Sequence, residues 1–368
     1  MTEIHQFLPT FASRDAIGMH TLRLRRVLRD AGFASEIYAD DIHEEVRGEA
    51  RPYLEYESRP RSGERWMLYH ASTGSPMADW LCRQDDPLMV DYHNITEARF
   101  FDRWAPLAAD SMRHARVQLR QLAPLTEYAW AHSRFSEAEL IDVGYRTTGV
   151  APLLVDWSEY DVAPNERTNA RLQQAKANGG ADWLFVGRLA PNKCQHHVVG
   201  AFAAYRKIFD PNARLTFVGG VTAPLYGRAL HTLVRQLELD DAVTFADSIT
   251  FPEVIAYYSN ADVFVCLSEH EGFNVPVVEA MRFSLPVVAY AGAAVPETVG
   301  DAGLVLAEKD PAFVAEAVHR VLTDRPTRTA LINAGHKRLE HFSLTNASRL
   351  TLAAINAFLD QRRGANAS

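Results

Sequence analysis

The sequence lacks several features that would place it in a common protein class. Its 368 residues include 3 cysteines, Cys82, Cys194 and Cys266, whose spacing suits neither a disulfide framework nor a zinc site. No apolar run approaches the ~18 residues of a transmembrane helix. The N-terminus also has no basic segment followed by an apolar one. We therefore expect a reduced, cytoplasmic protein without a signal peptide or a membrane span.

Positive charge and cofactor motifs are also scarce. The formal net charge is −8, and residues 1–160 contain no lysine. A nucleic-acid partner is not expected, because such binding needs a basic face. The Gly-x-Gly-x-x-Gly fingerprint is absent, which argues against an NAD-dependent oxidoreductase. The Walker A loop and any Asp-x-Asp pair are absent too, so no metal bridging a diphosphate is expected.

The sequence does contain a long alternation of short β-branched runs and amphipathic helices, which indicates βαβ units and parallel sheets. A weaker stretch over 151–180, rich in proline, asparagine and glycine, suggests an interdomain connection. We expect Rossmann-like domains at 1–160 and 161–345 and a terminal helix within 346–368. Ligands bind such sheets at the carboxyl ends of the strands, so the interdomain cleft is the default site. The expected strands are 34–39, 65–70, 88–93 and 126–131 in the first domain, and 183–186, 214–218, 242–245, 263–268 and 286–290 in the second.

The most informative stretch is 268–281, Ser-Glu-His-Glu-Gly-Phe-Asn-Val-Pro-Val-Val-Glu-Ala-Met, which follows a buried strand. Pro276 suits the first turn of a helix, so the loop before it would present backbone N–H groups at a helix N-terminus. Glu271 and Glu279 could then hold two hydroxyl-bearing parts of one ligand. The alternative is that both are solvated acids favoured by the helix dipole.

A second stretch ends a strand in Gly187 and Arg188, and Lys193 follows five residues later. Two cations at the carboxyl end of a strand suit a diphosphate, because arginine binds it in a bidentate manner and lysine acts as a point charge. The alternative is a pair of exposed turn cations.

Weaker candidates lie in the first domain. Gly18 would let a phosphate or sugar approach the backbone closely, although a plain turn glycine fits equally. His93, at the end of a strand, could bind a sugar hydroxyl or move a proton, although a lone histidine is more often structural. His70 and Ser133 are similar but weaker candidates.

Together these motifs resemble the retaining family-4 glycosyltransferases. The resemblance rests on Phe-Val-Gly-Arg-Leu-x3-Lys, on Phe-Val-Gly-Gly, on the Glu-x7-Glu pair formed by Glu271 and Glu279, and on Leu-Pro-Val-Val-Ala. It is strong over 183–310 and weaker in the first half. Three positions depart from the family pattern, Cys194, Asn274 and Ser284, and they bear on the identity of the donor sugar rather than on the class of reaction.

The resemblance implies a GT-B fold, an α/β architecture whose C-terminal helix crosses back to the first domain. It implies a nucleotide-diphosphate sugar bound mainly by the second domain, with the diphosphate on Arg188 and Lys193 and the ribose on Glu279. It places Glu271 at the donor sugar and His93 near the sugar and the acceptor. The remaining donor-site positions that it implies are Gly18, Ser248, Ile249, Gly272, Phe273, Asn274 and Val275.

The reaction expected from this resemblance is metal-independent transfer of a hexose with retention at the anomeric carbon, by front-face attack. GDP-mannose is preferred over UDP-glucose as donor, and the acceptor is a glycan or lipid-linked saccharide of a bacterial surface polysaccharide. No cofactor is expected. Rival functions are a sugar-phosphate synthase, a sugar-nucleotide epimerase and a non-catalytic nucleotide-sugar-binding subunit.

Residues 97–120 combine aromatic side chains with several arginines. A basic amphipathic helix of this kind could lie on the inner face of an anionic membrane. The alternative is that the aromatics are core residues and the arginines a solvated face.

Overall fold

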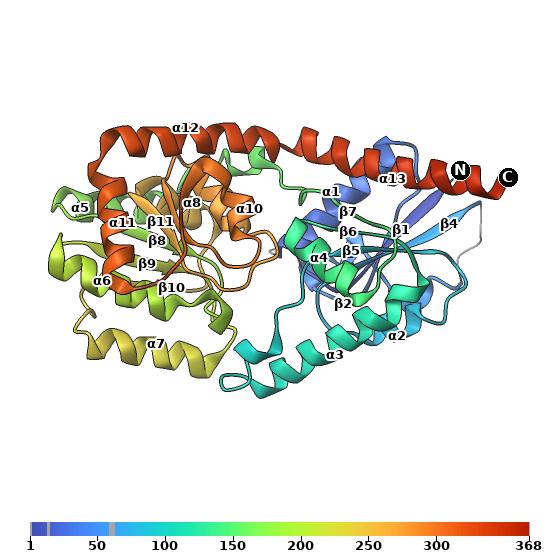
Figure 1. The fold of residues 1–368 in the computed structure, drawn as a ribbon, viewed down its shortest axis with the longest axis horizontal. Helices are drawn as coiled ribbons and strands as arrows, with labels where there is room; N and C mark the ends of the chain where they lie inside the picture. The colour runs from blue at the N-terminus through green and yellow to red at the C-terminus, as the bar shows by residue number, and fades with distance from the viewer. Residues whose placement is uncertain (1, 13–14, 59–62, 368) are drawn as a thin grey trace. The chain divides into compact units, whose positions relative to one another are not determined.

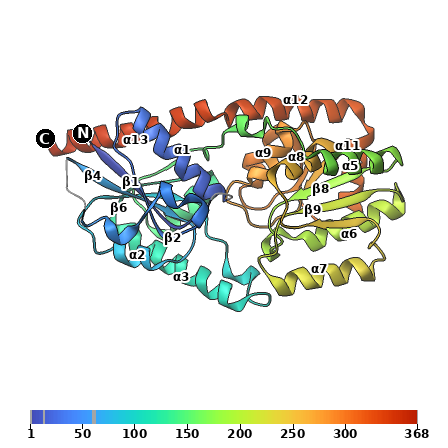
Figure 2. The same ribbon diagram turned by 180° about the vertical axis from the view of Figure 1, so that it is seen from behind.

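The structure, a computed structural model, describes residues 2–12, 15–58 and 63–367 (Figures 1 and 2). The chain divides into two compact units. Unit 1 comprises residues 1–98, 107–156 and 342–368, and unit 2 comprises 99–106 and 157–341. The division after Asp156 lies four residues before the boundary expected from the sequence. In the described part of the chain, no helix is long and apolar enough to cross a membrane.

Unit 1 is built on a parallel sheet of seven strands in the order β3-β2-β1-β4-β5-β6-β7. The strands are β1 (Glu3–Phe11), β2 (Ile37–Ile42), β3 (Arg51–Pro52), β4 (Arg65–Ala71), β5 (Leu88–Tyr92), β6 (Thr126–Ala131) and β7 (Thr148–Val150). The helices are α1 (Ala16–Asp30), α2 (Pro76–Leu81), α3 (Pro106–Leu122), α4 (Arg134–Val143) and α13 (Leu344–Ala367).

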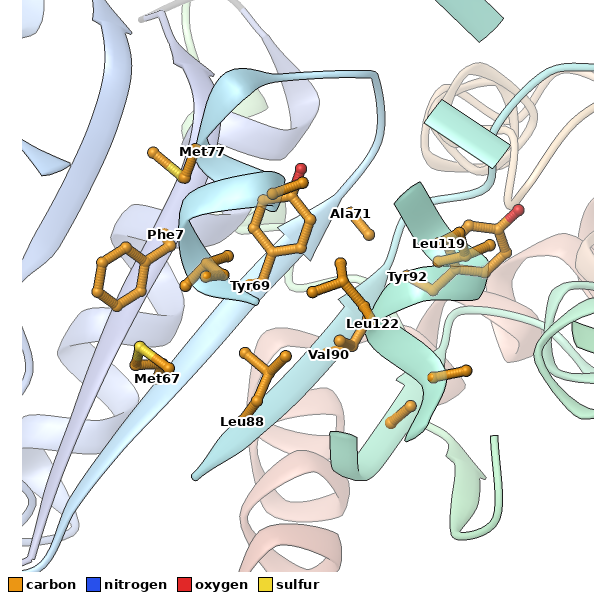
Figure 3. Packing of buried hydrophobic residues seen from close by; sticks show 14 of the residues in the cluster. Phe7, Met67, Tyr69, Ala71, Met77, Leu88, Val90, Tyr92, Leu119 and Leu122 are labelled. Carbon is orange, nitrogen blue, oxygen red and sulfur yellow. The ribbon is translucent and has the colours of Figure 1, made fainter. Parts of the chain in front are cut away.

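Helices cover both faces of this sheet, which explains why its strands are apolar on both sides. Along β4, Met67 and Tyr69 point to the face covered by α2 and α3, where Leu119 also packs (Figure 3). Trp66 and Leu68 alternate with them and point to the face covered by α1 and α13. The helix α13 thus packs on unit 1, with residues such as Ile355 and Leu359 fully buried.

Unit 2 contains a second parallel sheet, in the order β10-β9-β8-β11-β12-β13. Its strands are β8 (Asp182–Val186), β9 (Arg214–Val218), β10 (Val243–Ala246), β11 (Val263–Cys266), β12 (Val287–Tyr290) and β13 (Gly303–Leu306). Its helices are α5 (Glu166–Ala177), α6 (Gln195–Ile208), α7 (Pro224–Gln236), α8 (Phe251–Asn260), α9 (Val275–Arg282), α10 (Val295–Val299), α11 (Pro311–Thr323) and α12 (Arg325–His341).

Both faces of this second sheet are covered as well. Phe264 of β11 packs with Tyr258 of α8 and Val277 of α9 on one face. Trp183 of β8 packs on Phe202 of α6 on the other face, with ring centroids 5.5 Å apart. The expected α/β class with two Rossmann-like parallel sheets is therefore confirmed.

Three segments differ from the sequence-based expectations. The strand expected at 34–39 is β2 at Ile37–Ile42, because residues up to 36 complete the turn after α1. The stretch interpreted as an interdomain connection contains a full helix, α5, whose N-cap Asn165 accepts from the N–H of Thr168. Within 97–120 only Pro106–Leu122 forms an α-helix, α3.

Candidate functional site

The loop between β11 and α9 carries Glu271, and α9 itself carries Glu279, the second acid of the Glu-x7-Glu pair. Asn274 precedes α9 in a left-handed backbone conformation (φ 74°), and its side-chain Nδ2 donates to Cys266 Sγ at 3.1 Å. Pro276 occupies the first turn of α9, where its missing N–H costs no hydrogen bond. Two expectations are met here: the helix begins at Val275, and the loop before it lies at the carboxyl end of a buried strand.

Glu271 and Lys193 form a partly buried ion pair. The Lys193 Nζ donates to both carboxylate oxygens of Glu271, at 2.7 and 2.6 Å. The two segments are joined by further bonds: the backbone N–H of Glu269 donates to the Asn192 carbonyl at 2.9 Å, and the Asn192 amide donates to the His270 carbonyl at 3.0 Å. The structure thus brings together the cation and the acid that the family resemblance assigns to the diphosphate and to the donor sugar.

Arg188 follows β8, next to the place where the backbone after β8 lies against the end of β9. Gly187 donates to the carbonyl of Val218 at 2.8 Å, and a Cβ on Gly219 would lie 2.4 Å from the Gly187 carbonyl oxygen. The Arg188 side chain is exposed, and it makes no ion pair or hydrogen bond with the described residues. It is therefore a cation at the carboxyl edge of the sheet that is available to an anionic ligand.

Glu279 is held by two tyrosines that sequence reasoning missed. Tyr160, at the end of a 3₁₀ helix (Trp157–Tyr160), donates to one carboxylate oxygen at 2.5 Å, and Tyr258 of α8 donates to the other at 2.5 Å. Burial raises the pKa of Glu279, and the two hydroxyl donors oppose that rise. Burial, together with the nearby carboxylate, raises the pKa of Tyr258, which keeps the phenol protonated as a donor.

The two positions expected near the base lie after β10. Ser248 is exposed, has a positive φ of 55°, and donates to Asp247 at 3.3 Å. Ile249 is partly buried and packs against the core cluster that contains Tyr258. Both residues therefore lie in unit 2, with Ile249 bordering the core that also supports Glu279.

The segment 99–106 belongs to unit 2, and its contacts bear on whether the aromatic side chains of residues 97–120 pack inside the protein or face a membrane. Phe100 packs edge-on against His270, with ring centroids 5.9 Å apart, and Trp104 packs against Tyr226 at 5.3 Å. Arg116 of α3 is paired inside unit 1 with Glu139, at 3.0 Å. Phe100, Trp104 and Arg116 therefore make their contacts with other side chains of the protein.

Unit 1 contains a cluster of four histidines around one buried carboxylate, which we call the histidine cluster: His20, His70, Asp91, His93 and His132. His20 comes from α1, and the other four stand at or just after the carboxyl ends of β4, β5 and β6. Asp91 Oδ2 lies 2.9 Å from His20 Nε2 and 3.4 Å from His70 Nδ1, and Oδ1 lies 3.1 Å from His132 Nε2. All five side chains are almost completely buried.

The charges in the histidine cluster are strongly coupled. Burial alone would raise the pKa of Asp91, but the surrounding histidines outweigh it and hold this pKa well below its usual range. Burial opposes the charged form of His132, yet Asp91 raises its pKa overall. Burial lowers the pKa of His20 to about 4 and that of His93 well below its usual value. The histidines thus favour the ionised form of Asp91, and Asp91 in turn favours the charged form of His132.

Gly18 and His93, the two site residues expected in the first domain, both lie in unit 1. A Cβ on Gly18 would lie 2.4 Å from the carbonyl oxygen of Ala12, and the Gly18 N–H donates to Asp15 at 3.2 Å. His93 is enclosed, because its Nε2 lies 3.0 Å from His70 Nδ1 and its Nδ1 lies 3.1 Å from His132 Nε2. Packing inside unit 1 is thus enough to require this glycine and to use both ring nitrogens of His93.

A pattern in the sequence could have revealed the histidine cluster. His70, His93 and His132 each stand at the end of a successive strand, and β4, β5 and β6 are neighbours in the sheet. Carboxyl ends of neighbouring parallel strands meet at one edge, so the three side chains had to come close together. By contrast, nothing in the local sequence connects Tyr160 or Tyr258 with Glu279.

Comparison with known proteins finds a family match that lies within unit 2. Residues 166–338 match the model of the family described as glycosyl transferases group 1. The chain is similar to D-inositol 3-phosphate glycosyltransferases of Pseudarthrobacter chlorophenolicus (29% identity over 64% of this chain and 56% of the relative) and Geodermatophilus obscurus (32% over 72% and 60%). It thus spans little more than half the length of these two relatives. It also resembles a GDP-mannose-dependent alpha-(1-6)-phosphatidylinositol monomannoside mannosyltransferase of Mycobacterium tuberculosis (33% over 41% of each chain).

Solved structures share the whole architecture. A sucrose-phosphate synthase from Thermosynechococcus elongatus superposes with a TM-score of 0.74, covering 98% of this chain and 100% of the other at 19% identity. Anabaena HepE in complex with UDP-glucose superposes with a TM-score of 0.73, covering 96% and 99% at 17% identity. At these identities the likeness concerns the fold. The chain therefore has the GT-B fold, and its residues 166–338 carry the sequence signature of the group 1 glycosyltransferases.

Proposed function

We propose that this protein is a glycosyltransferase that moves a hexose from a nucleotide-diphosphate sugar to a hydroxyl of an acceptor. The observation that carries the proposal is an arrangement in unit 2 of three groups: an available cation after β8, an ion-paired acid after β11, and a tyrosine-held acid in the following helix α9. The match of residues 166–338 to the group 1 glycosyltransferases covers these same residues.

Each group has a distinct role in this proposal. Arg188 binds the diphosphate as the available cation, and Lys193 adds a second positive charge while it keeps Glu271 in place. Glu279, with its oxygens aligned by Tyr160 and Tyr258, accepts from the ribose hydroxyls. Glu271 and the backbone of Gly272, Phe273, Asn274 and Val275 contact the donor sugar. Ser248 and Ile249 border the base.

The costly step is departure of the diphosphate, which leaves an oxocarbenium-like centre on the sugar. Preorganised positive charge where negative charge grows lowers this barrier, and removal of one such group typically costs about 2–4 kcal/mol. Arg188 and Lys193 supply that charge, so the proposed reaction needs no metal ion at the diphosphate. In the proposed front-face attack the acceptor hydroxyl bonds to the anomeric carbon as the phosphate oxygen leaves, and that oxygen takes the hydroxyl proton. The configuration is retained.

The substrates are proposed from the relatives. GDP-mannose and phosphatidylinositol monomannoside appear in the name of one relative, and D-inositol 3-phosphate appears in the name of another. We propose GDP-mannose ahead of UDP-glucose, and a saccharide or cyclitol acceptor that can be lipid-linked, as in surface polysaccharide synthesis. Membrane contact through α3, where Leu107 is 87% exposed, belongs to the same proposal. The contact of Gly18 with the phosphates and of His93 with the acceptor, which the family resemblance implies, stays a prediction.

The test is acceptor-dependent release of nucleoside diphosphate in the presence of EDTA. GDP-mannose, UDP-glucose and their ADP counterparts are offered with D-inositol 3-phosphate and with lipid-linked saccharides, and the anomeric configuration of the product is read by NMR. We expect turnover with the sugar of one nucleotide. We also expect the sugar in the product to have the same anomeric configuration as in the donor. Product with an inverted centre would contradict the retaining mechanism, and no turnover of any donor would contradict the proposed function.

A further inference from the structure

We propose that unit 1 binds one divalent transition-metal ion through His70 Nδ1, His93 Nε2 and Asp91 Oδ2. The site lies within the histidine cluster and does not depend on the transfer reaction proposed for unit 2. Its ligand set is two imidazoles and one carboxylate, all supplied by the ends of β4 and β5.

The spacing of the three ligand atoms fits such an ion. The two imidazole nitrogens lie 3.0 Å apart, and they lie 3.4 Å (His70) and 3.7 Å (His93) from Asp91 Oδ2. Metal–ligand bonds of about 2.0–2.1 Å in a tetrahedral arrangement place ligand atoms roughly 3.3 Å apart. The three atoms therefore surround a point at bonding distance from each of them.

His20 also lies close, with all four candidate ligand atoms within 4.8 Å of one another, but its hydrogen bonds exclude it as a ligand. Its Nδ1 accepts the backbone N–H of Leu154 at 3.0 Å. A neutral imidazole that accepts at Nδ1 carries its proton on Nε2, and that nitrogen then donates to Asp91 at 2.9 Å. His20 is therefore an outer partner that orients the ligating carboxylate.

The other outer contacts suit metal ligands equally well. His70 Nε2 lies 2.9 Å from Gln6 Oε1, and the Gln6 amide nitrogen donates to the Thr21 carbonyl at 3.1 Å, which fixes the oxygen toward His70. His70 thus donates through Nε2 and leaves Nδ1 free of a proton, as a metal ligand requires.

His93 completes the arrangement through His132. His132 Nδ1 lies 2.9 Å from the carbonyl oxygen of Ala151, so that nitrogen carries a proton. With a metal on His93 Nε2, the proton of His93 lies on Nδ1 and is donated to His132 Nε2, 3.1 Å away. The bonds of His132 to Ala151 and to His93 are then kept, the ion pair of His132 Nε2 with Asp91 Oδ1 is given up as that carboxylate binds the metal, and one proton leaves the cluster for solvent.

The ligand chemistry selects the ion. Imidazole with carboxylate suits Zn²⁺, Co²⁺ and Fe²⁺, whereas Mg²⁺ and Ca²⁺ prefer oxygen ligands alone. Zn²⁺ is the ion to test first, with Co²⁺ as its spectroscopic substitute. Because the three side chains are at most 3% exposed, equilibration with the ion should be slow.

The experiment uses the full chain, stripped with a chelator and equilibrated by dialysis with Zn²⁺ or Co²⁺. We expect one ion per chain, a Co²⁺ visible spectrum typical of low coordination number, and an anomalous peak between the three ligand atoms in Zn²⁺-soaked crystals. No stoichiometric ion in the wild-type chain, or a peak only at surface histidines, would overturn the proposal.

Variants separate ligands from neighbours. His70→Gln should lose more than roughly 100-fold in Zn²⁺ affinity, whereas His20→Gln should lose about 10–100-fold and keep one ion per chain. His43→Gln, an exposed histidine of the same unit, should leave affinity unchanged. Equal binding by wild type and folded His70→Gln would contradict the site. If His70→Gln does not fold, the wild-type stoichiometry and the anomalous peak still decide.

Discussion

Arg188 and Lys193 differ in how the fold holds them, and this gives a prediction at the scale of single residues. Arg188→Ala should leave the free energy of unfolding nearly unchanged and weaken nucleoside-diphosphate binding, because its side chain is exposed and unpaired among the described residues. Lys193→Ala should also lower stability, by about 1–3 kcal/mol, since it leaves the carboxylate of Glu271 buried without its partner. Chemical denaturation and titration calorimetry measure the two effects. Equal stability losses would contradict the distinction.

Glu279 gives a second prediction at this scale. Burial raises its pKa, so donor affinity should fall as the pH decreases through that raised value, because the protonated acid accepts hydroxyl bonds poorly. Tyr258→Phe removes a donor that opposes the rise and should move the midpoint of this pH profile upward. Nucleotide titrations across pH test it, with Tyr257→Phe as the neighbouring control. A midpoint that does not move would show that Tyr258 does not tune this acid.

At the scale of elements, the ends of β8 and β9 depend on Gly219. Its φ is 137°, and a Cβ there would lie 2.4 Å from the Gly187 carbonyl oxygen. Gly219→Ala should therefore cost more than the roughly 1–2 kcal/mol expected from a positive φ alone. Gly179→Ala is the matched control in the same unit, because its φ is 79° and nothing lies near its added Cβ. Equal losses of unfolding free energy would mean that the backbone contact does not matter.

His196, in the first turn of α6, should make the free energy of unfolding depend on pH. Burial lowers the pKa of His196 to about 4, whereas its unfolded value is near 6.5. Between these values the unfolded chain binds the extra proton, so stability should fall as the pH decreases from 6.5 to 4. His196→Asn should flatten this part of the curve relative to wild type. Unfolding midpoints at several pH values check it, and an unchanged slope would contradict the assignment.

Much of the fold could be predicted from the sequence, and the failures have physical causes. The buried strands were found because their apolar runs are contiguous, as in sheets covered on both faces. The helix α5 was missed because its only buried residue is Thr168, so it has little apolar periodicity. The Lys193–Glu271 contact follows from parallel topology. The hydrogen bonds from Tyr160 and Tyr258 to Glu279 depend on long-range packing that no local sequence pattern predicts.

At the scale of the whole molecule, the chain crosses between its units more than once, and its last helix, α13, completes unit 1. Ile355 is fully buried against Leu24 and Trp66 in the same cluster. Ile355→Ala should therefore destabilise unit 1 by about 2–5 kcal/mol and leave the unfolding of unit 2 unchanged. Hydrogen exchange resolved by segment measures both. Loss of protection confined to unit 2 would contradict the assignment of α13.

The most direct test of the account is a calorimetric titration of wild type, Arg188→Ala and Glu279→Ala with GDP, UDP, ADP and NAD in EDTA. The account predicts that wild type binds one nucleoside diphosphate without metal. It also predicts that both variants lose at least about tenfold in affinity, equal to 1.4 kcal/mol, and that NAD does not bind. Binding of NAD alone, or full nucleotide affinity in both variants, would contradict the donor site proposed for unit 2.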